Sequence, residues 1–506
     1  MSKSILKHSY QHWYTEYLHL SDTHMYLITG GVVVVALLSA MHPDFLKTIV
    51  ALASKGAWTS IRKFIGRRWW RAGEGVWVGD VFIADDSRLR HTHILGATGT
   101  GKTVLLEHLI QADILRGNGV IIIDPKGDRK FYERIRDFCR QVGRERDLHL
   151  LSATYSEESC RWNPCALGTP DELQTKWFQS GVYDNPFYAD ACYLALIDAF
   201  NWLHEKNEGE AITLSDLLAR LEQQALAKKN DHIEGLFNQL KAFALSEWGP
   251  LLCANRAGVP NRHQREITLW DIVRKNEILF VDLPTESKAI QSSRIGKLLL
   301  QEVTLLSGLR KSYPHLVKDS RPYSVYVDEF DAFATEAFGM FLNKGRSSNL
   351  MIHMAHQTIG DLERVSNEFA KVVVGNCDIH AIFRMNHPDE ADFMARFIGT
   401  KTVTKQTTQA DAGISTGRSS NRETEEYIVH PNRIKNLKIG ECVLSMKMVS
   451  FCRVIRVPKP GSIKSVTPGP KMGAPAPTNP PRARRSLDQG ADEYAGIMRE
   501  TVVPHD

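Results

Sequence analysis

Eight consecutive residues have the composition of a phosphate-binding loop of the pattern GxxxxGK[ST]. They are Gly96, Ala97, Thr98, Gly99, Thr100, Gly101, Lys102 and Thr103. The glycines let successive backbone N–H groups point into one concavity that holds phosphate oxygens. In this pattern Lys102 contacts the β- and γ-phosphates and the Thr103 hydroxyl ligates Mg²⁺. The segment therefore predicts a site for ATP and Mg²⁺.

Two adjacent carboxylates, Asp328 and Glu329, follow the apolar segment 323–327. By itself such a pair is more often a solvated strand end than a catalytic one. Hydrolysis of ATP needs one carboxylate near the metal and another that orients or deprotonates the attacking water. Because a phosphate loop lies upstream, we assign Asp328 to the metal and Glu329 to the base.

Two more polar residues flank the apolar segment 350–356. Gln357 follows it and would either sense the γ-phosphate or simply cap a strand. Arg346 precedes it, after Gly345, and would be either a solvated surface charge or an arginine finger supplied across a subunit interface. The residues alone leave both alternatives open.

Strands and helices must bring these residues together. Residues 91–95 read as a short strand before the phosphate loop, and residues 104–115 as an apolar-periodic helix after it. The β-branched run 119–124 reads as a buried parallel strand, and it ends in the turn 124–128, which is either a ligand loop or a plain Pro/Gly turn. This order predicts an α/β fold whose ligands bind at the carboxyl ends of the strands.

In the middle of the chain the apolar residues change from the pattern of strands to that of helices. Residues 187–203, 214–229 and 233–245 show the 3.6-residue periodicity of amphipathic helices. We therefore expect an all-α insertion over residues 170–265. It would divide the nucleotide-binding domain into a first part, residues 72–169, and a second part, residues 266–457.

The two ends of the chain are predicted to lie outside this domain. Residues 25–41 carry no charge and are just long enough for a transmembrane span, against the alternative of a buried soluble element. Residues 45–61 would form either a second span or a surface helix. The basic, tryptophan-containing stretch 62–71 is typical of a cytoplasmic flank, so residues 1–71 are predicted to be a membrane anchor. The Pro/Gly-rich tail 458–506 is expected to be disordered.

Composition narrows the choice of functional class only slightly. The net charge of +5 permits contact with nucleic acid or an anionic membrane without arguing for either. The eight cysteines are scattered, with no CxxC pair, so we expect reduced thiols and no structural metal.

Taken in order, these segments resemble the type IV secretion coupling proteins, which are hexameric, membrane-anchored ATPases of bacterial conjugation. The likeness is greatest to the conjugative coupling factors called TraD. The shared segments are 76–80, 96–103, 124–128, 162–164, 327–329, 345–346, 355–357, 375–377 and 413–417. The resemblance implies a RecA-like domain in a homo-hexameric ring with ATP at subunit interfaces. It also implies that Arg346 reaches a neighbour's ATP and that Gln357 couples the γ-phosphate to movement.

The resemblance further implies a function. The chain would be a DNA-translocating ATPase of the bacterial inner membrane, with its ATPase domain in the cytoplasm, that hands single-stranded DNA with its bound relaxase to a type IV secretion channel. Two alternatives stay open: a double-stranded DNA pump of the chromosome-segregation type, and a receptor that recruits protein effectors with ATP as an assembly switch. Stimulation of ATPase activity by DNA separates the two motors from the receptor.

Overall fold

The structure is a computed structural model of the 506-residue chain. It describes residues 75–183, 185–207, 211–228, 231–252, 265–317, 321–411 and 414–460. The predicted anchor, residues 1–71, and nearly all of the predicted tail, residues 458–506, lie outside these ranges. Among the helices that the structure describes, none combines the length and the apolar composition needed to cross a membrane.

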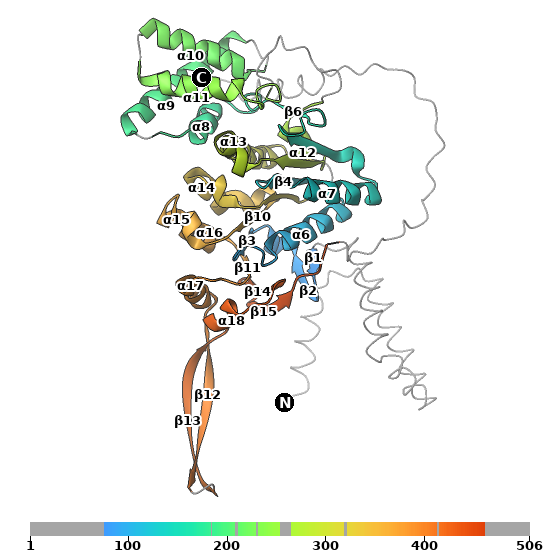
Figure 1. The fold of residues 1–506 in the computed structure, drawn as a ribbon, viewed down its shortest axis with the longest axis vertical. Helices are drawn as coiled ribbons and strands as arrows, with labels where there is room; N and C mark the ends of the chain where they lie inside the picture. The colour runs from blue at the N-terminus through green and yellow to red at the C-terminus, as the bar shows by residue number, and fades with distance from the viewer. Residues whose placement is uncertain are drawn as a thin grey trace, which may run out of the picture. The chain divides into compact units, whose positions relative to one another are not determined.

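A nine-stranded sheet forms the centre of the molecule, with the strand order β15-β14-β11-β3-β10-β9-β4-β8-β5 (Figure 1). Seven strands run parallel: β3 (Thr92–Leu95), β4 (Val120–Asp124), β5 (Leu148–Ser152), β8 (Ile278–Asp282), β9 (Tyr323–Val327), β10 (Leu350–His356) and β11 (Ile379–Ile382). Two antiparallel strands, β14 (Glu441–Met446) and β15 (Phe451–Arg456), extend one edge. The prediction of an α/β fold is confirmed.

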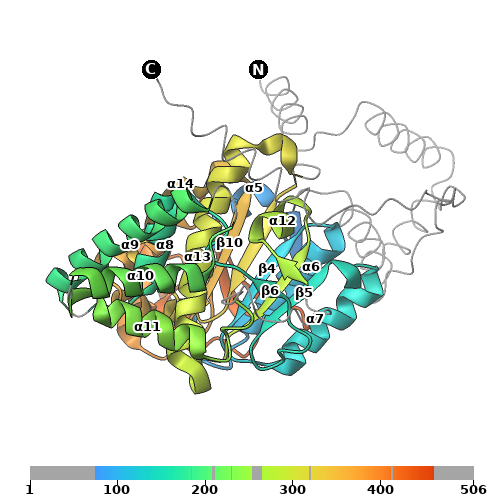
Figure 2. The same cartoon turned by 90° about the horizontal axis from the view of Figure 1, so that it is seen from above.

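Helices cover both faces of this sheet, which explains why its strands are apolar on both sides. Figure 2 shows α6 and α7 on one side of the sheet and α13 on the other. The helices outside the insertion are α5 (Asp85–Arg88), α6 (Lys102–Arg116), α7 (Arg129–Val142), α12 (Leu269–Arg274), α13 (Thr285–Ser312), α14 (Glu336–Lys344), α15 (Ile359–Glu363), α16 (Asn367–Asn376), α17 (Pro388–Ile398) and α18 (Pro431–Lys435). In the five-residue strands β4, β8 and β9 every residue is buried.

A helical bundle interrupts the sheet domain between β6 (Arg161–Trp162) and β7 (Glu266–Ile267), which pair with each other in parallel. It consists of α8 (Pro170–Ser180), α9 (Pro186–Lys206), α10 (Leu214–Lys228) and α11 (Glu234–Leu245). A capping box at Thr169 starts α8, and Leu196, Phe200 and Leu240 are fully buried between the helices. These helices fall in the range predicted for the all-α insertion, although the domain boundaries themselves stay a prediction.

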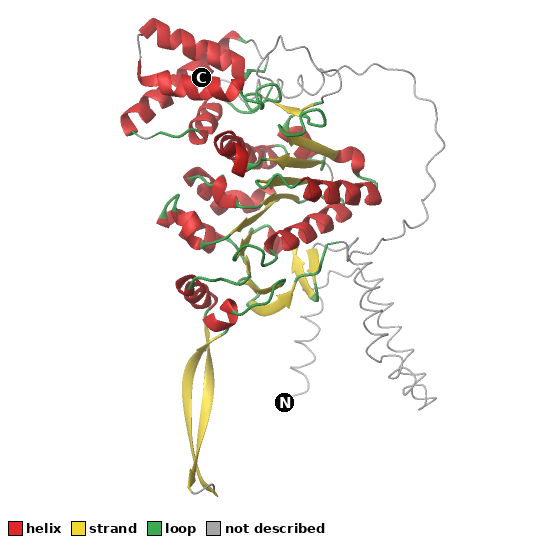
Figure 3. Cartoon of the chain, viewed as in Figure 1, coloured by secondary structure: helices red, strands yellow, loops and turns green. Residues whose placement is uncertain are grey.

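Two antiparallel hairpins complete the described structure (Figure 3). The first joins β1 (Gly75–Val78) to β2 (Val81–Ala84) ahead of the phosphate loop. The second is a long ribbon of β12 (Thr400–Asp411) and β13 (Ile414–Tyr427), which projects from the sheet domain next to α17 and α18 (Figure 1). We had not expected the ribbon, because its sequence is polar on both faces and lacks the alternation that marks a half-buried strand.

Candidate nucleotide-binding site

The predicted site residues come from three neighbouring strands. The phosphate loop follows β3, Gln357 follows β10, and the pair Asp328–Glu329 follows β9. The parallel register pairs Leu95 with His356, so the phosphate loop and Gln357 leave the sheet at the same level. The structure therefore brings the loop, the carboxylate pair and Gln357 to one edge of the sheet.

The phosphate loop has the backbone shape that its glycines permit. Gly101, which precedes α6, has φ +119°, and Gly96 has φ +150° with Phe383 so close that a Cβ would lie 2.6 Å from the phenylalanine Cβ. The Lys102 ammonium donates to the carbonyl oxygens of Gly96 (2.6 Å) and Ala97 (3.1 Å). Lys102 thus lies inside the curve of the loop, where phosphate oxygens would also lie.

Asp328 and Glu329 have different surroundings although they are adjacent. The Thr103 hydroxyl donates to Asp328 Oδ2 at 2.9 Å, and Asp328 is only 3% exposed. Glu329 is partly exposed and has a left-handed backbone, with φ 42°. Partial burial raises the pKa of Glu329, and the charge of Asp328 adds to the rise while Lys126 opposes it. Oxygen ligands such as Thr103 and Asp328 suit Mg²⁺, so these residues fit the expected metal.

Lys126, in the turn after β4, belongs to the site although the sequence did not predict a role for it. Its ammonium lies 2.5 Å from Asp328 Oδ2 and 3.1 Å from the Thr103 hydroxyl oxygen. Asp124 shapes the turn by accepting the backbone N–H groups of Lys126 (3.2 Å) and Asp128 (3.0 Å). Burial raises the pKa of Asp124 to about 7. The available signal was the position of this turn at the carboxyl end of a buried strand, where ligands bind in α/β folds.

Gln357 is tied directly to the phosphate loop. Its side-chain oxygen accepts a hydrogen bond of 2.8 Å from the Thr98 hydroxyl. This hydrogen bond joins the phosphate loop to the residue that follows β10. The structure brings these two predicted residues together, and a role for Gln357 in sensing the γ-phosphate stays a proposal.

Three buried histidines cross-link the strands behind the site. His93 on β3 lies between His356 on β10 and His380 on β11. Its Nε2 atom is 2.5 Å from Nε2 of His356, and its Nδ1 atom is 3.2 Å from Nδ1 of His380. Burial lowers the pKa of His356 and of His380 to about 4. The imidazoles of His356 and His380 are therefore neutral at pH 7, and this histidine row (His93, His356 and His380) joins the strands that carry the loop and Gln357.

Arg346 lies away from the phosphate loop of its own chain. It precedes β10, in a short 3₁₀ turn (Gly345–Ser348), whereas Gln357 follows that strand. A seven-residue strand separates the two by about 20 Å. The half-exposed guanidinium of Arg346 pairs with Asp86 at 3.1 Å. The structure thus does not bring Arg346 together with the other predicted site residues, and its role as an arginine finger stays a proposal.

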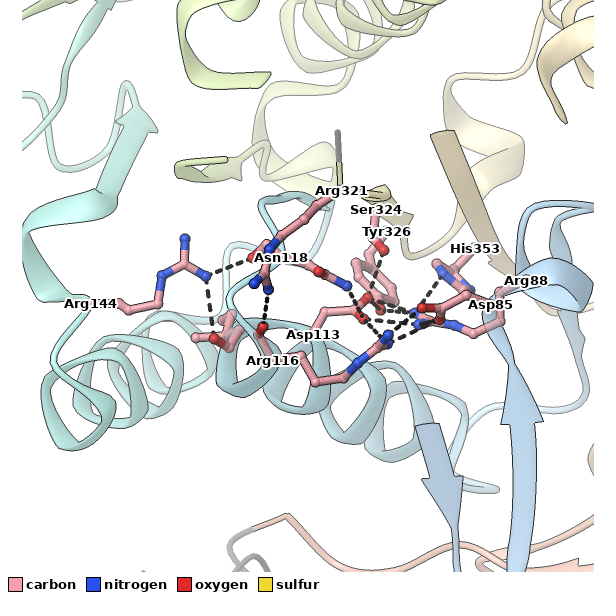
Figure 4. A network of polar contacts seen from close by, with 11 residues as sticks. Asp85, Arg88, Asp113, Arg116, Asn118, Arg144, Arg321, Ser324, Tyr326 and His353 are labelled. Atoms are coloured by element: carbon pink, nitrogen blue, oxygen red, sulfur yellow. Dashed lines mark hydrogen bonds and ion pairs between the residues drawn. The ribbon is translucent and has the colours of Figure 1, made fainter. Parts of the chain in front are cut away.

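A buried ion network fixes α6 against the strand that carries the carboxylate pair (Figure 4). Arg88 makes two hydrogen bonds to Asp113, of 2.9 and 2.6 Å, and one of 2.9 Å to the hydroxyl of Tyr326 on β9. Burial alone would raise the pKa of the Asp113 carboxyl, but the charge of Arg88 holds it well below its usual range. Arg116 pairs with Asp85 in the same network.

Comparison with known proteins agrees with this arrangement. Residues 76–242 match the family model described as the type IV secretion-system coupling protein DNA-binding domain. Residues 322–438 match the model described as the TraM recognition site of TraD and TraG. The type 4 coupling protein DotL of Legionella pneumophila strain Philadelphia 1 is 22% identical over 409 residues, which is 66% of this chain. The chain spans about half, 52%, of the length of that relative.

Solved structures give the same fold. The conjugative coupling protein TrwB in an unbound form superposes with a TM-score of 0.57 at 17% identity, over 78% of this chain and 91% of that one. TrwB in complex with ADP and Mg²⁺ superposes with a TM-score of 0.54 at 17% identity, over 78% of this chain and 92% of that one. VirB4 of Thermoanaerobacter pseudethanolicus superposes with a TM-score of 0.51 at 15% identity, over 76% of this chain and 96% of that one.

The fold and the loop define a RecA-like P-loop nucleotide-binding protein with a large, mainly parallel sheet. Within that class, the two family models and the coupling-protein relative support a type IV secretion coupling protein. The resemblance found in the sequence is thereby confirmed at the level of the family. The matches do not separate the TraD group from its relatives.

Proposed function

We propose that this chain is a membrane-anchored, DNA-translocating ATPase that links single-stranded DNA with its relaxase to a type IV secretion channel at the bacterial inner membrane. One observation carries the proposal. The phosphate loop, the carboxylate pair and Gln357 converge on one edge of the sheet in a chain of the coupling-protein family. The predicted anchor supports the membrane location, although it lies outside the described residues.

In the proposed hydrolysis, the loop N–H groups and Lys102 hold the phosphates of ATP. Thr103 and Asp328 would hold Mg²⁺, which when bound neutralises charge on the phosphates. Glu329 orients the attacking water and accepts its proton, a role that its raised pKa favours because a more basic carboxylate is a better acceptor. Gln357 responds to the γ-phosphate through its bond to the loop.

In the proposed ring, a homo-hexamer, Arg346 completes the nucleotide site of the neighbouring subunit. Its position at the opposite end of β10 from the phosphate loop supports action in trans. A guanidinium delivered by a neighbour stabilises charge on the transferring phosphoryl group. Hydrolysis would then depend on assembly, which is what a rotary or sequential motor requires.

The proposed cargo is DNA because one matching family model describes a DNA-binding domain and the other a TraM recognition site. Lys and Arg side chains lining the ring would contact the phosphates of a single strand, with little reading of its bases. Binding of this kind weakens steeply as salt increases, because condensed counter-ions are released on association.

The purified protein tests this proposal through its ATPase rate with single-stranded DNA, with duplex DNA and without DNA. We expect stimulation by single strands that falls as salt rises, and no activity in Lys102→Ala. Preference for duplex DNA would favour the chromosome-segregation type of pump. Absence of any stimulation by DNA would favour the effector receptor.

A further inference from the structure

The most unusual contact in the site is the one between Lys126 and the two expected metal ligands. The Lys126 ammonium is 2.5 Å from Asp328 Oδ2 and 3.1 Å from Thr103 Oγ1, and these two oxygens are themselves joined by a hydrogen bond of 2.9 Å. The three groups form a closed triangle. A positive charge of the protein therefore contacts the same pair of oxygens that is expected to bind Mg²⁺.

A rigid turn places Lys126 there. Asp124 is buried and accepts both the Lys126 N–H and the Asp128 N–H, and the backbone of Pro125 accepts from the N–H (2.8 Å) and hydroxyl (3.0 Å) of Thr285. Gly127 follows in a left-handed conformation, with φ +65°. Because these hydrogen bonds hold the backbone on both sides of Lys126, a displacement of its ammonium would be a movement of the side chain.

Charge explains why an ammonium is held at this point. Asp124, Asp328 and Glu329 bring carboxyl groups to the same edge of the sheet, and Lys102 is engaged with the carbonyl oxygens of its own loop. Asp328 is almost fully buried, so it requires a partner of opposite charge. Lys126 supplies that charge through an ion pair in which its own side chain is 39% exposed.

An ammonium and a divalent cation cannot both contact this pair of oxygens. Each would lie within hydrogen-bond or coordination distance of Thr103 Oγ1 and Asp328 Oδ2, so the two cations would be a few Å apart, where like charges repel strongly. Lys126 therefore has to leave the pair before a metal can bind. Glu329 Oε1, 3.9 Å from the ammonium, is a second carboxylate that it can approach when it leaves.

We propose that Lys126 is a displaceable counter-cation, which holds Thr103 and Asp328 together when no divalent metal is bound and competes with the metal for them. This role rests on the proposed nucleotide function of the same site. It makes Lys126 a positioning residue that sets the affinity for the metal. After displacement, its ammonium stays beside Glu329, the proposed base.

The test measures the affinity of Mn²⁺ for the full-length protein saturated with ADP, by the electron paramagnetic resonance signal of free Mn²⁺. ADP is chosen because it lacks the γ-phosphate and excludes turnover. We expect Lys126→Met to bind Mn²⁺ at least about fivefold more tightly than wild type, because a competing charge has been removed. Lys126→Arg, which keeps the charge, should stay near the wild-type affinity. Lys130→Met, an exposed lysine four residues further along, is the matched control and should change nothing.

Unchanged or weaker Mn²⁺ binding in Lys126→Met, with ADP binding and thermal melting retained, would overturn the proposal. Lys126→Gln serves as a second neutral variant and should show the same tightening. A wild-type protein that binds neither ADP nor Mn²⁺ would overturn the proposed function itself, and with it the role of Lys126. A wild type that binds both, beside a Lys126→Met variant of equal affinity, would remove only the role of Lys126.

Discussion

At the scale of single residues, the adjacent carboxylates Asp328 and Glu329 differ in their surroundings and in their proposed roles. Asp328 is buried and paired with Thr103 and Lys126, whereas Glu329 is partly exposed on a left-handed backbone. A non-glycine residue in this conformation costs about 1 kcal/mol, and such strain is often found at functional sites.

The first prediction concerns Glu329→Gln. The variant should bind ATP as wild type does, because Lys102 and the loop are unchanged, but hydrolyse it about 10²- to 10⁴-fold more slowly, because the proton acceptor is lost. Nucleotide binding by fluorescence and phosphate release measure the two effects separately. Glu336→Gln, at an exposed position in α14, is the control. Wild-type turnover in Glu329→Gln would remove Glu329 as the base.

Residues in contiguous motifs could be predicted, and residues that act across the fold could not. The phosphate loop and the pair Asp328–Glu329 each follow an apolar strand directly, so local order was enough to find them. Lys126 reaches Asp328 across 202 positions of sequence, and Arg88 reaches Tyr326 across 238. Such contacts depend on which strands are neighbours, which the periodicity of a single strand does not reveal.

At the scale of elements, the ion network of Arg88 joins α5, α6 and β9. We predict that Arg88→Met lowers the free energy of unfolding by about 3–5 kcal/mol, because it removes the cation that is hydrogen-bonded to the buried Asp113 carboxylate. Arg90→Met removes the more exposed ion pair with Asp86 and should cost less than about 1 kcal/mol. Thermal melting compares the two variants. Equal stability of Arg88→Met and wild type would show that the network does not hold α6 in place.

The histidine row predicts a loss of stability in acid. Burial lowers the pKa of His380 to about 4 in the folded protein, against about 6.5 when unfolded. Its contribution to the free energy of unfolding is fully present above pH 6.5 and is lost as the pH falls toward 4. At pH 5 the loss amounts to about 2 kcal/mol.

His380→Gln should therefore reduce the difference in unfolding free energy between pH 7 and pH 5 by about that amount, measured by urea titration. His387→Gln, at an exposed position, should leave the difference as in wild type. A pH difference in His380→Gln equal to that of wild type would contradict the neutral, buried row.

Elements were predictable where their periodicity was strong. The strands predicted over 91–95 and 119–124, the helix after the phosphate loop and the three predicted helices of the insertion lie where their apolar patterns placed them, whereas β5, β11 and α8 were not predicted. The β12–β13 ribbon was not predicted because its sequence is mostly polar and lacks the apolar alternation that marks a strand.

At the scale of the whole molecule, the central hypothesis is a ring with shared nucleotide sites. The prediction concerns mixtures of two inactive variants, Arg346→Ala and Lys102→Ala. Arg346→Ala keeps its own phosphate loop, and Lys102→Ala keeps the arginine that a neighbour needs. Mixed rings should recover part of the ATPase rate that each variant alone has lost. Failure to recover activity at any mixing ratio would count against a finger acting in trans.

The sequence also could not supply the strand order of the sheet. It indicated a parallel α/β arrangement, but β4 lies beside β8 and β9, whose residues are separated from it by the whole helical insertion. That order follows from long-range packing, and it places Asp124, Asp328 and the phosphate loop at one edge. The cargo was likewise inferred from the family rather than from any described side chain.

The most direct test of the account is transfer of a mobilisable plasmid from cells whose own copy of this protein has been deleted and replaced by a variant. We predict that wild type restores transfer and that Glu329→Gln, produced at the same level, restores none, because nucleotide binding without hydrolysis cannot drive translocation. Glu336→Gln should restore transfer fully. Transfer at the wild-type level with Glu329→Gln would contradict the claim that ATP hydrolysis at this site moves the DNA.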